Sequence, residues 1–301
     1  MKLGLVLPVA GYETSPELIV QVAEEAERIG LDSLWTADAL LRPTDQPLDF
    51  GNGMKVEMPP ATACQYEPLE TLSYVAARTS RIELGTSAVV ALFQNPPALA
   101  RRLATLDRLS GGRLVAGLGQ GWVPQAFKVA GVSLKRRGAG FEEHIRAMRA
   151  CWGPDPVRFE GRFYQIPESE IGPKPVRPDG PQLLIGAAGE AGLRRAARLE
   201  VGLNPVFWSW DALIAMVEAF HREGRAFGHE PGTLPIVLRV NGDITNHASE
   251  ERLPLTGTVD QVAKDVDRLR SLGVDHAFWA MFATDPDSQL DAMRRLRAAV
   301  G

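Results

Sequence analysis

Cysteine is scarce in this sequence of 301 residues, which contains only Cys64 and Cys151. Two cysteines so far apart in the sequence predict neither a disulfide framework nor a cysteine-rich metal cluster. We therefore expect no metal site and two free thiols, buried or partly buried, in a protein of a reducing compartment.

Long hydrophobic runs and an excess of charge of one sign are also missing. No apolar segment reaches the roughly 20 residues that a membrane-spanning helix needs. The first residues, MKLGLVLPVAG, have one lysine and a short apolar run broken by Pro8, which predicts a first strand and not a signal peptide. The formal net charge of -4 offers no basic surface for nucleic acid. These absences predict a cytoplasmic protein that binds neither membrane nor nucleic acid.

Several short catalytic motifs are absent: the sequence has no HExxH, no GxSxG and no GxxxxGK followed by serine or threonine. Gly117, Gly119 and Gly121 are spaced somewhat like a dinucleotide-binding fingerprint, but the third glycine is misplaced and no helix starts directly after it. Two interpretations remain for these glycines: a tight turn at a strand end, or a bare backbone that a flat ligand can approach closely.

Alternating strands and helices dominate what is present, in a chain that is 45% hydrophobic and 23% charged. The apolar runs predict eight strands, at residues 3–7, 33–36, 84–90, 113–119, 182–185, 203–207, 234–244 and 274–282. Helix-start signals fall between them: Ser15-Pro16, Asn95-Pro96, a capping box of Thr258 and Gln261, and Asp285-Pro286. Eight such repeats predict one (β/α)8 (TIM) barrel domain over residues 1–301, with a doubly wound sheet as the alternative.

In a barrel, the loops that follow strands form the catalytic face. The long segments 40–65, 120–136, 186–189 and 245–257 all follow predicted strands, and the first is long enough to suggest a functional loop. The segment 153–181 precedes a strand, so we expect its small hairpin at 157–166 to be architectural.

Polar residues at strand ends are the candidates for chemistry, and they are Asp38, Gln120, Asn241 and Asp243. An aspartate at such a position can also be a turn or cap residue. His276 starts the eighth strand, on the opposite face, and is expected to be structural. His144 lies in a helix and is expected to be packed or solvated.

Two further features of the predicted catalytic face could bind ligands. Gly186, Ala187, Ala188 and Gly189 join a strand to a helix start, whose free N–H groups suit a phosphate, although a short connection needs small residues too. Trp208 and Trp279, near the ends of the sixth and eighth strands, either wall an apolar substrate pocket or fill the barrel rim.

Five segments of the chain carry a family resemblance: GTSAVV, TLDRLSGGRLVAGLGQGW, VRFEGRFYQIP with GPKPV, IGAAGEAGLRRAAR, and LTGTVDQVAKDVDRLRSLGVDH. Together and in this order they resemble the bacterial luciferase-like superfamily, and within it the F420-dependent oxidoreductases. The resemblance implies a (β/α)8 barrel, usually dimeric, that holds the deazaflavin coenzyme F420 or FMN at its C-terminal mouth.

The resemblance also implies roles for individual residues. Ser87 and Ala88 match a non-proline cis peptide that backs the cofactor ring, and Gly119 and Gln120 match the loop that lines it. The turn at 186–189 matches the family's phosphate-binding turn. Asp38 matches the aspartate of an Asp-His pair, but Ala39 replaces the histidine, and Gln120 is neutral where the sugar-phosphate dehydrogenases have an acid.

The function that the resemblance implies is an F420-dependent oxidoreductase, which passes a hydride between C5 of the deazaflavin and a small organic substrate. Asp38 and Gln120 would then lie nearest the chemistry, with Trp208 and Trp279 toward the substrate. A homodimer is expected. The alternatives are an FMN-dependent two-component monooxygenase, supplied by a separate reductase, and a barrel that binds its cofactor or ligand without catalysis.

Overall fold

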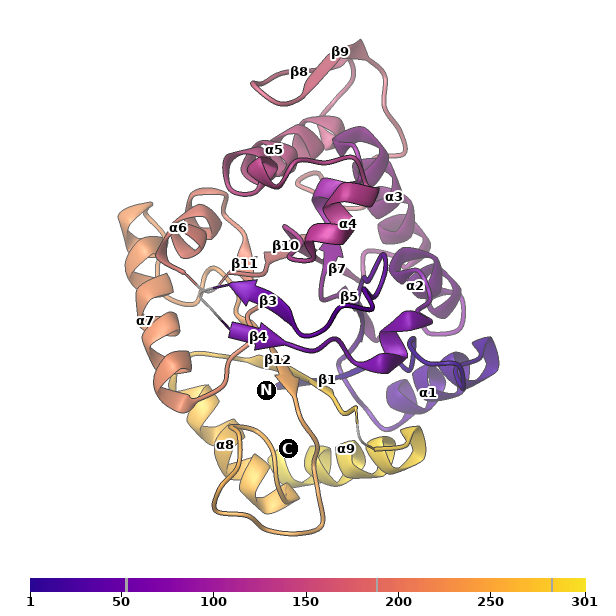
Figure 1. Ribbon diagram of the computed structural model, residues 1–301, viewed down its shortest axis with the longest axis vertical. Coiled ribbons are helices and arrows are strands. Elements are labelled where there is room, and N and C mark those ends of the chain that lie inside the picture. Colours follow the sequence, from indigo (N-terminus) through magenta and orange to yellow (C-terminus); the bar gives the residue numbers. More distant parts are fainter. Residues whose placement is uncertain (52–53, 188, 283) are drawn as a thin grey trace.

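The computed structural model describes residues 1–51, 54–187, 189–282 and 284–301, and its centre is a parallel barrel (Figure 1). The barrel strands are β1 (Lys2–Val6), β2 (Ser33–Thr36), β5 (Glu83–Thr86), β7 (Leu114–Gly119), β10 (Gln182–Ile185), β11 (Gly202–Leu203), β12 (Val237–Asn241) and β13 (His276–Ala280). Neighbouring strands pair in the order β11-β10-β7-β5-β2-β1-β13-β12. A parallel bridge between Leu203 and Ile236 joins the two ends of this order, which closes the barrel.

A helix follows each barrel strand and packs outside it, so that the helices form a ring around the strands (Figure 1). The ring consists of α1 (Pro16–Arg28), α2 (Pro68–Ala76), α3 (Pro96–Leu109), α5 (Ala139–Trp152), α6 (Glu190–Arg198), α7 (Trp210–Ala226), α8 (Val259–Ser271) and α9 (Pro286–Val300). The short α4 (Pro124–Val129) is an addition between β7 and α5. This alternation confirms the predicted (β/α)8 barrel.

Local capping explains why the helices begin where the sequence predicts. The Ser15 hydroxyl accepts a hydrogen bond from the N–H of Leu18, and the Asn95 side chain accepts one from the N–H of Ala98. Thr258 and Gln261 form the predicted capping box of α8. Each of these side chains satisfies an amide that has no acceptor within its own helix.

Four barrel strands differ by more than one residue from the predicted ones. Two of them, β12 and β13, are shorter than the predicted strands 234–244 and 274–282. The predicted strand 84–90 is divided, because the cis peptide between Ser87 and Ala88 separates β5 from β6 (Val89–Val90). The sixth strand was expected over residues 203–207, but β11 ends at Leu203. Pro205 follows at once and has no N–H to donate to a neighbouring strand.

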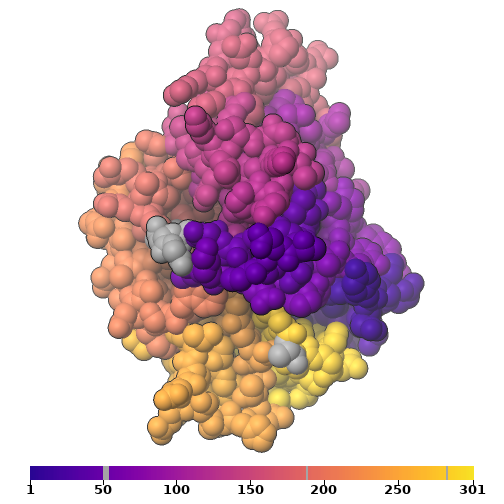
Figure 2. All heavy atoms as spheres, viewed as in Figure 1, coloured from indigo at the N-terminus to yellow at the C-terminus, as the bar shows by residue number. Residues whose placement is uncertain are grey.

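The segment 40–65, predicted as an irregular loop, contains a hairpin of β3 (Leu48–Gly51) and β4 (Met54–Val56) and the short 3-10 helix η1 (Pro60–Ala63). Figure 1 shows this hairpin lying in front of the barrel strands, and in Figure 2 the same violet segment crosses the centre of the molecule. The predicted hairpin near residue 160 is also present, as β8 (Val157–Glu160) and β9 (Gln165–Ser169), outside α5.

The buried apolar side chains form one large cluster between strands and helices and a second cluster inside the barrel. The inner cluster consists of Trp35, Val115, Leu184, Val237 and Phe278. Both cysteines are free thiols, with Cys151 buried and Cys64 half-buried. Among the helices of the described ranges, none combines the length and the apolar character that crossing a membrane requires.

Candidate active site

A stack of aromatic rings fills the inside of the barrel. The C-terminal ends of the strands therefore remain as the place where a ligand can bind. The rings of Trp35 and Phe278 are parallel within 9°, with centroids 4.1 Å apart. The Trp35 indole N–H donates to the Ser33 hydroxyl at 2.8 Å, and that hydroxyl contacts His276 Nε2 at 2.7 Å. Burial lowers the pKa of His276 to about 3, so the imidazole is a neutral part of the floor, as the sequence predicts.

The cis peptide between Ser87 and Ala88 lies at the C-terminal end of β5, on the wall of the mouth. The N–H of Ser87 donates to the carbonyl of Thr36 at 2.7 Å, which ties the peptide to β2. On the other side, Val90 pairs with Gly119 of β7. Ser87 is buried, whereas Ala88 is half-buried, so Ala88 is more accessible to solvent than Ser87.

Gly119 lies beside Ala88, so the structure brings these two predicted residues together. A Cβ at Gly119 would be 3.5 Å from the Cβ of Ala88, an ordinary van der Waals contact. At Gly117, in contrast, a Cβ would approach the carbonyl oxygen of Thr86 to 1.9 Å. The two glycines therefore differ: strand packing requires Gly117, whereas a methyl group at Gly119 would fit in ordinary contact with Ala88 and Val89.

Gln120 follows Gly119, and its side-chain oxygen accepts a hydrogen bond of 2.6 Å from the N–H of Gly138. This contact holds the two ends of the loop after β7 together. The amide NH2 group of Gln120 can still donate to a ligand. Gln120 therefore binds Gly138 through its side-chain oxygen and keeps its N–H groups for a ligand.

The carboxylate of Asp38, at the end of β2, accepts a hydrogen bond of 2.9 Å from the N–H of Val90. Burial raises the pKa of Asp38, opposed by this hydrogen bond and by the charge of Arg102. Burial, together with the charge of Asp38, also raises the pKa of Glu67. Asp38 is thus a carboxyl group that keeps its proton to a higher pH than usual, next to the cis-peptide wall.

Arg239 is a residue of the mouth that the sequence analysis missed. It lies on β12, and its Nη1 donates to the carbonyl oxygen of Ser87 at 2.6 Å. Its Nε donates to the side chain of Asn241 at 2.9 Å. The signal that could have revealed it is the alternation of VLRVN, which places Val237, Arg239 and Asn241 on the same, inner face of the strand.

The turn after β10 lies next to β7, because the N–H of Gly186 donates to the carbonyl of Leu118 at 3.2 Å. Gly189 is the N-cap of α6 and has no side chain that could cap it. A Cβ at Gly189 would meet nothing within 4 Å, which leaves the helix start open to a ligand. Ala187 is half-buried beside it, and Ala188 lies outside the described residues.

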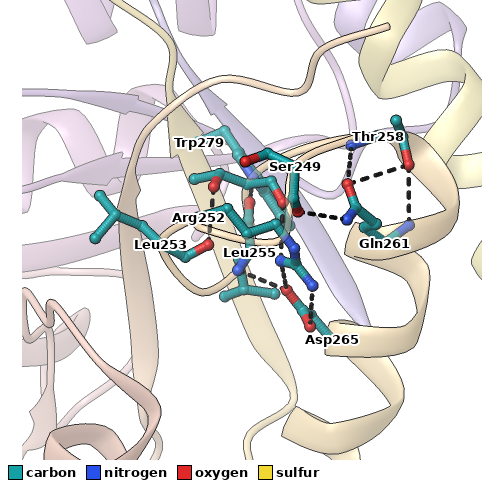
Figure 3. Close-up of polar contacts among 9 residues, drawn as sticks. Ser249, Arg252, Leu253, Leu255, Thr258, Gln261, Asp265 and Trp279 are labelled. Atoms are coloured by element: carbon teal, nitrogen blue, oxygen red, sulfur yellow. Dashed lines mark hydrogen bonds and ion pairs between the residues drawn. The ribbon is translucent and has the colours of Figure 1, made fainter. Parts of the chain in front are cut away.

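Trp279 lies away from the mouth, because it is on the outer face of β13. It is fully buried among the helix-facing side chains, and its indole N–H donates to the carbonyl of Leu255 at 2.9 Å (Figure 3). The N–H of Leu255 donates to Asp265 at 2.8 Å, and Arg252 forms an ion pair with the same carboxylate (Figure 3). These contacts attach the loop after β12 to α8 and bury Trp279 beneath it.

Trp208, by contrast, is exposed on the loop between β11 and α7. Trp208 is 45% exposed. Tyr12, after β1, is 82% exposed, and Phe282, after β13, is 60% exposed. Loops that follow barrel strands lie at the C-terminal end. The mouth therefore has an aromatic rim to which Trp208 contributes and Trp279 does not.

The β3–β4 hairpin is held over the mouth by its own small apolar cluster. Leu48 and Met58 pack there against Val123 and Ala126, from the start of α4. A groove of about 830 Å³ lies elsewhere on the surface, between α1, α2 and α9. Several of its charges are paired with one another, as in the ion pairs of Arg78 with Glu24 and of Arg294 with Glu25.

The protein is thus a closed (β/α)8 barrel. At the C-terminal ends of its strands, the wall contains the cis peptide of Ser87 and Ala88 and the bare backbone of Gly119. The model of the luciferase-like monooxygenase family matches residues 1–248, and the chain belongs to this family. Within the described residues, no group of three or more histidine, cysteine, aspartate or glutamate side chains is arranged to hold a metal ion.

Curated relatives of the chain include F420-dependent enzymes. The F420-dependent glucose-6-phosphate dehydrogenase of Amycolatopsis mediterranei is 33% identical over 177 residues, which cover 56% of this chain and 49% of that protein. The chain thus spans about half the length of this relative. The enzyme of the same name from Kineococcus radiotolerans is 29% identical over 267 residues, 83% of this chain and 74% of the relative.

Solved structures with the same fold include both oxygenases and F420-dependent enzymes. The monooxygenase RslO1 from Streptomyces bottropensis has a TM-score of 0.81 at 22% identity, covering 100% of this chain and 98% of its own. An F420-dependent secondary alcohol dehydrogenase in complex with an F420-acetone adduct also has a TM-score of 0.81, at 17% identity, covering 100% and 99%. At these identities, the likeness establishes the fold alone.

Proposed function

We propose that the protein is an F420-dependent oxidoreductase that acts on a small organic substrate. The observation that carries the proposal is the position of Ala88 beside Gly119 at the C-terminal end of β7, where a small side chain and a bare backbone lie side by side. The names of the two glucose-6-phosphate dehydrogenase relatives favour F420 as the cofactor.

The residues of the mouth fit a flat, phosphorylated cofactor. The half-buried Ala88 and the bare Gly119 leave room for a ring to lie against the wall. The helix start at Gly189 has N–H groups and a positive dipole end that suit a phosphate, although Glu190 in the first turn opposes it. Ala187 and Ala188 would be part of the same phosphate-binding turn.

When bound, F420 supplies hydride transfer at C5 of its deazaflavin ring. The protein's part is to orient the reactants and to exclude water. Asp38 would hold a proton near the cis-peptide wall, and the amide NH2 of Gln120 would donate to the ligand. The aromatic floor and the hairpin above the mouth would keep the site dry, with Trp208 at its rim.

Separate additions of oxidised F420 and FMN to the purified apoprotein test the proposal, with the fluorescence of each ligand as the readout. We expect F420 to bind and FMN to bind much more weakly. Tight binding of FMN without binding of F420 would overturn the proposal.

A second candidate function is an FMN-dependent two-component monooxygenase, supplied with reduced FMN by a separate reductase. The observation that favours it is Ala39, which leaves Asp38 without a neighbouring imidazole in the sequence. Oxygen uptake coupled to product formation, with reduced FMN supplied, would support this function. No uptake under these conditions would count against it.

We also propose that the protein forms a homodimer, as the sequence resemblance implies. Light scattering coupled to size-exclusion chromatography measures the mass in solution directly. A mass of twice the 32.7 kDa of one chain is expected, and a mass of one chain at micromolar concentration would contradict the proposal.

A further inference from the structure

Arg239 reaches across the whole barrel to the cis-peptide wall. In the closed order of strands, three strands separate β12 from β5 in either direction, so the two strands are diametrically opposite. The guanidinium of Arg239 nevertheless donates to the Ser87 carbonyl at 2.6 Å. The positive charge therefore lies at the cis-peptide wall, next to the Ser87 carbonyl.

No carboxylate compensates this charge. Among the described residues, no acidic group pairs with the guanidinium of Arg239, whose two hydrogen-bond partners are the neutral Ser87 carbonyl and the Asn241 amide oxygen. Burial lowers the pKa of Arg239 to about 10, and no acidic group offsets this effect. An arginine inside a protein without a counter-ion is unusual, because a buried charge is costly unless it is paired.

The guanidinium also keeps unused hydrogen-bond donors. It has five N–H groups, and the contacts with Ser87 and Asn241 occupy one at Nη1 and the one at Nε. Arg239 is half-buried by its surface area, and no hydrogen bond to another described residue uses its remaining guanidinium N–H groups. A planar fork of this kind binds carboxylates in a bidentate way.

We infer that Arg239 is a substrate-binding residue that selects substrates with a carboxylate and an apolar body. The carboxylate would supply the missing negative charge at Arg239. The apolar body would lie toward the aromatic rim of Tyr12, Trp208 and Phe282, which have large exposed surfaces. This inference rests on the proposed function for the reaction that the substrate undergoes. The binding of a carboxylate at Arg239 is a separate claim that can be tested without that reaction.

Benzoate and benzamide test the inference, because they have the same shape and differ in charge. Calorimetric titrations measure their affinities for the wild type, Arg239→Met and Arg239→Lys, with and without F420. Arg225→Met is the matched control, because Arg225 is an exposed arginine in the last turn of α7. Thermal unfolding of each variant identifies any loss that comes from misfolding.

We expect wild type and Arg225→Met to bind benzoate more tightly than benzamide. In Arg239→Met, the affinity for benzoate should fall on the order of tenfold to hundredfold, with the affinity for benzamide unchanged. Arg239→Lys should recover part of the loss, since it keeps the charge without the fork. An equal loss for both probes would overturn the inference, because Arg239 would then merely position Ser87.

The negative charge could also come from the reduced cofactor ring, and the reduction potential of the bound cofactor distinguishes this source. A potential that falls in Arg239→Met, with unchanged benzoate affinity, would assign the charge to the ring and overturn the inference. Failure of the proposed function gives a different result: F420 would not bind, while the apoprotein would still discriminate benzoate from benzamide through Arg239.

Discussion

The Oδ2 atom of Asp38 accepts a hydrogen bond of 2.9 Å from the backbone N–H of Val90. Val90 belongs to β6, the short strand that follows the cis peptide. The same carboxyl group that is the candidate proton donor therefore also holds the proposed cofactor wall against the end of β2. A substitution at Asp38 changes both functions unless it keeps the hydrogen-bond acceptor.

Asp38→Asn separates these two functions of Asp38, because asparagine retains an acceptor for the Val90 N–H and loses the titrating proton. If Asp38 transfers a proton, kcat should fall roughly 10²–10⁴-fold in Asp38→Asn, with F420 affinity unchanged. Asp38→Ala should lose turnover and also about 1–3 kcal/mol of unfolding free energy, since the Val90 N–H loses its partner. Steady-state kinetics and denaturant unfolding measure these effects.

The pH dependence of turnover gives an independent check on Asp38. Burial raises the pKa of this carboxyl, so its acid form persists above the ordinary value of 3.8. A reaction that uses the acid form should slow as the pH rises through the raised pKa, and Asp38→Asn should lack this limb of the profile. Wild-type turnover in Asp38→Asn would show that Asp38 only holds the wall.

Gly119 and Gly117, two residues apart on β7, should respond differently to alanine. A Cβ at Gly119 meets the Cβ of Ala88 at 3.5 Å, so Gly119→Ala should fold normally and fill part of the cofactor space. We expect F420 affinity to fall about tenfold or more, with an unchanged Tm. Wild-type F420 affinity in Gly119→Ala would mean that the ring does not lie against this residue.

Gly117→Ala is the matched comparison, because its Cβ would come within 1.9 Å of the Thr86 carbonyl oxygen. Backbone atoms of two paired strands must then move apart. We expect at least about 1–3 kcal/mol of lost stability, measured by denaturant unfolding. A stable Gly117→Ala variant would contradict this account of the strand packing.

Local interactions explain which parts of the fold could be predicted from the sequence. The caps at Ser15 and Asn95 are fixed within one helical turn, and both predictions are confirmed. The end of β11 was predicted wrongly, because the apolar Val206 and Phe207 extended the predicted strand past Pro205, which cannot donate to a neighbouring strand.

The positions of single side chains around the barrel depended on tertiary contacts that the sequence does not display. Phe278 faces inward and Trp279 outward, and a strand register shifted by one residue would exchange them. In the sequence, nothing distinguishes Arg239 from other polar residues of a strand, because its contact is on the opposite wall of the barrel. Ser87, on that wall, is 152 residues away in the sequence.

Glu143 tests whether the β8–β9 hairpin is architectural. Its carboxylate accepts hydrogen bonds from the N–H groups of Arg162, Phe163 and Tyr164, at 3.0, 2.6 and 2.8 Å. Glu143→Ala should remove about 1–2 kcal/mol of stability and increase hydrogen exchange at these amides. Glu160→Ala, on the same hairpin, is the control, because its ion pair with Arg158 is exposed.

An architectural hairpin predicts that F420 affinity is unchanged in Glu143→Ala. The β8–β9 hairpin lies outside α5, whereas the proposed cofactor wall is on β5 and β7 (Figure 1). A changed F420 affinity, without general unfolding, would show instead that the hairpin contributes to the site.

Two buried histidines should make the fold sensitive to acid. Burial lowers the pKa of His276 to about 3 and that of His144 to about 4, from an ordinary value of 6.5. Between these values and about pH 6.5, the unfolded chain binds protons that the folded chain does not. Stability therefore falls as the pH falls through this window, by at most about 1.4 kcal/mol per pH unit for each histidine.

Denaturant unfolding between pH 4.5 and 7.5 measures this slope. His276→Gln keeps a group that can bond to the Ser33 hydroxyl and removes the titration, so its slope should be clearly smaller than that of the wild type, although His144 and His221 still contribute. His247→Gln, in an exposed loop, should leave the slope unchanged. The raised pKa values of Asp38 and Glu67 act in the opposite direction in all variants, so the difference between variants isolates the histidine. An identical slope in wild type and His276→Gln would mean that His276 is protonated in the folded protein.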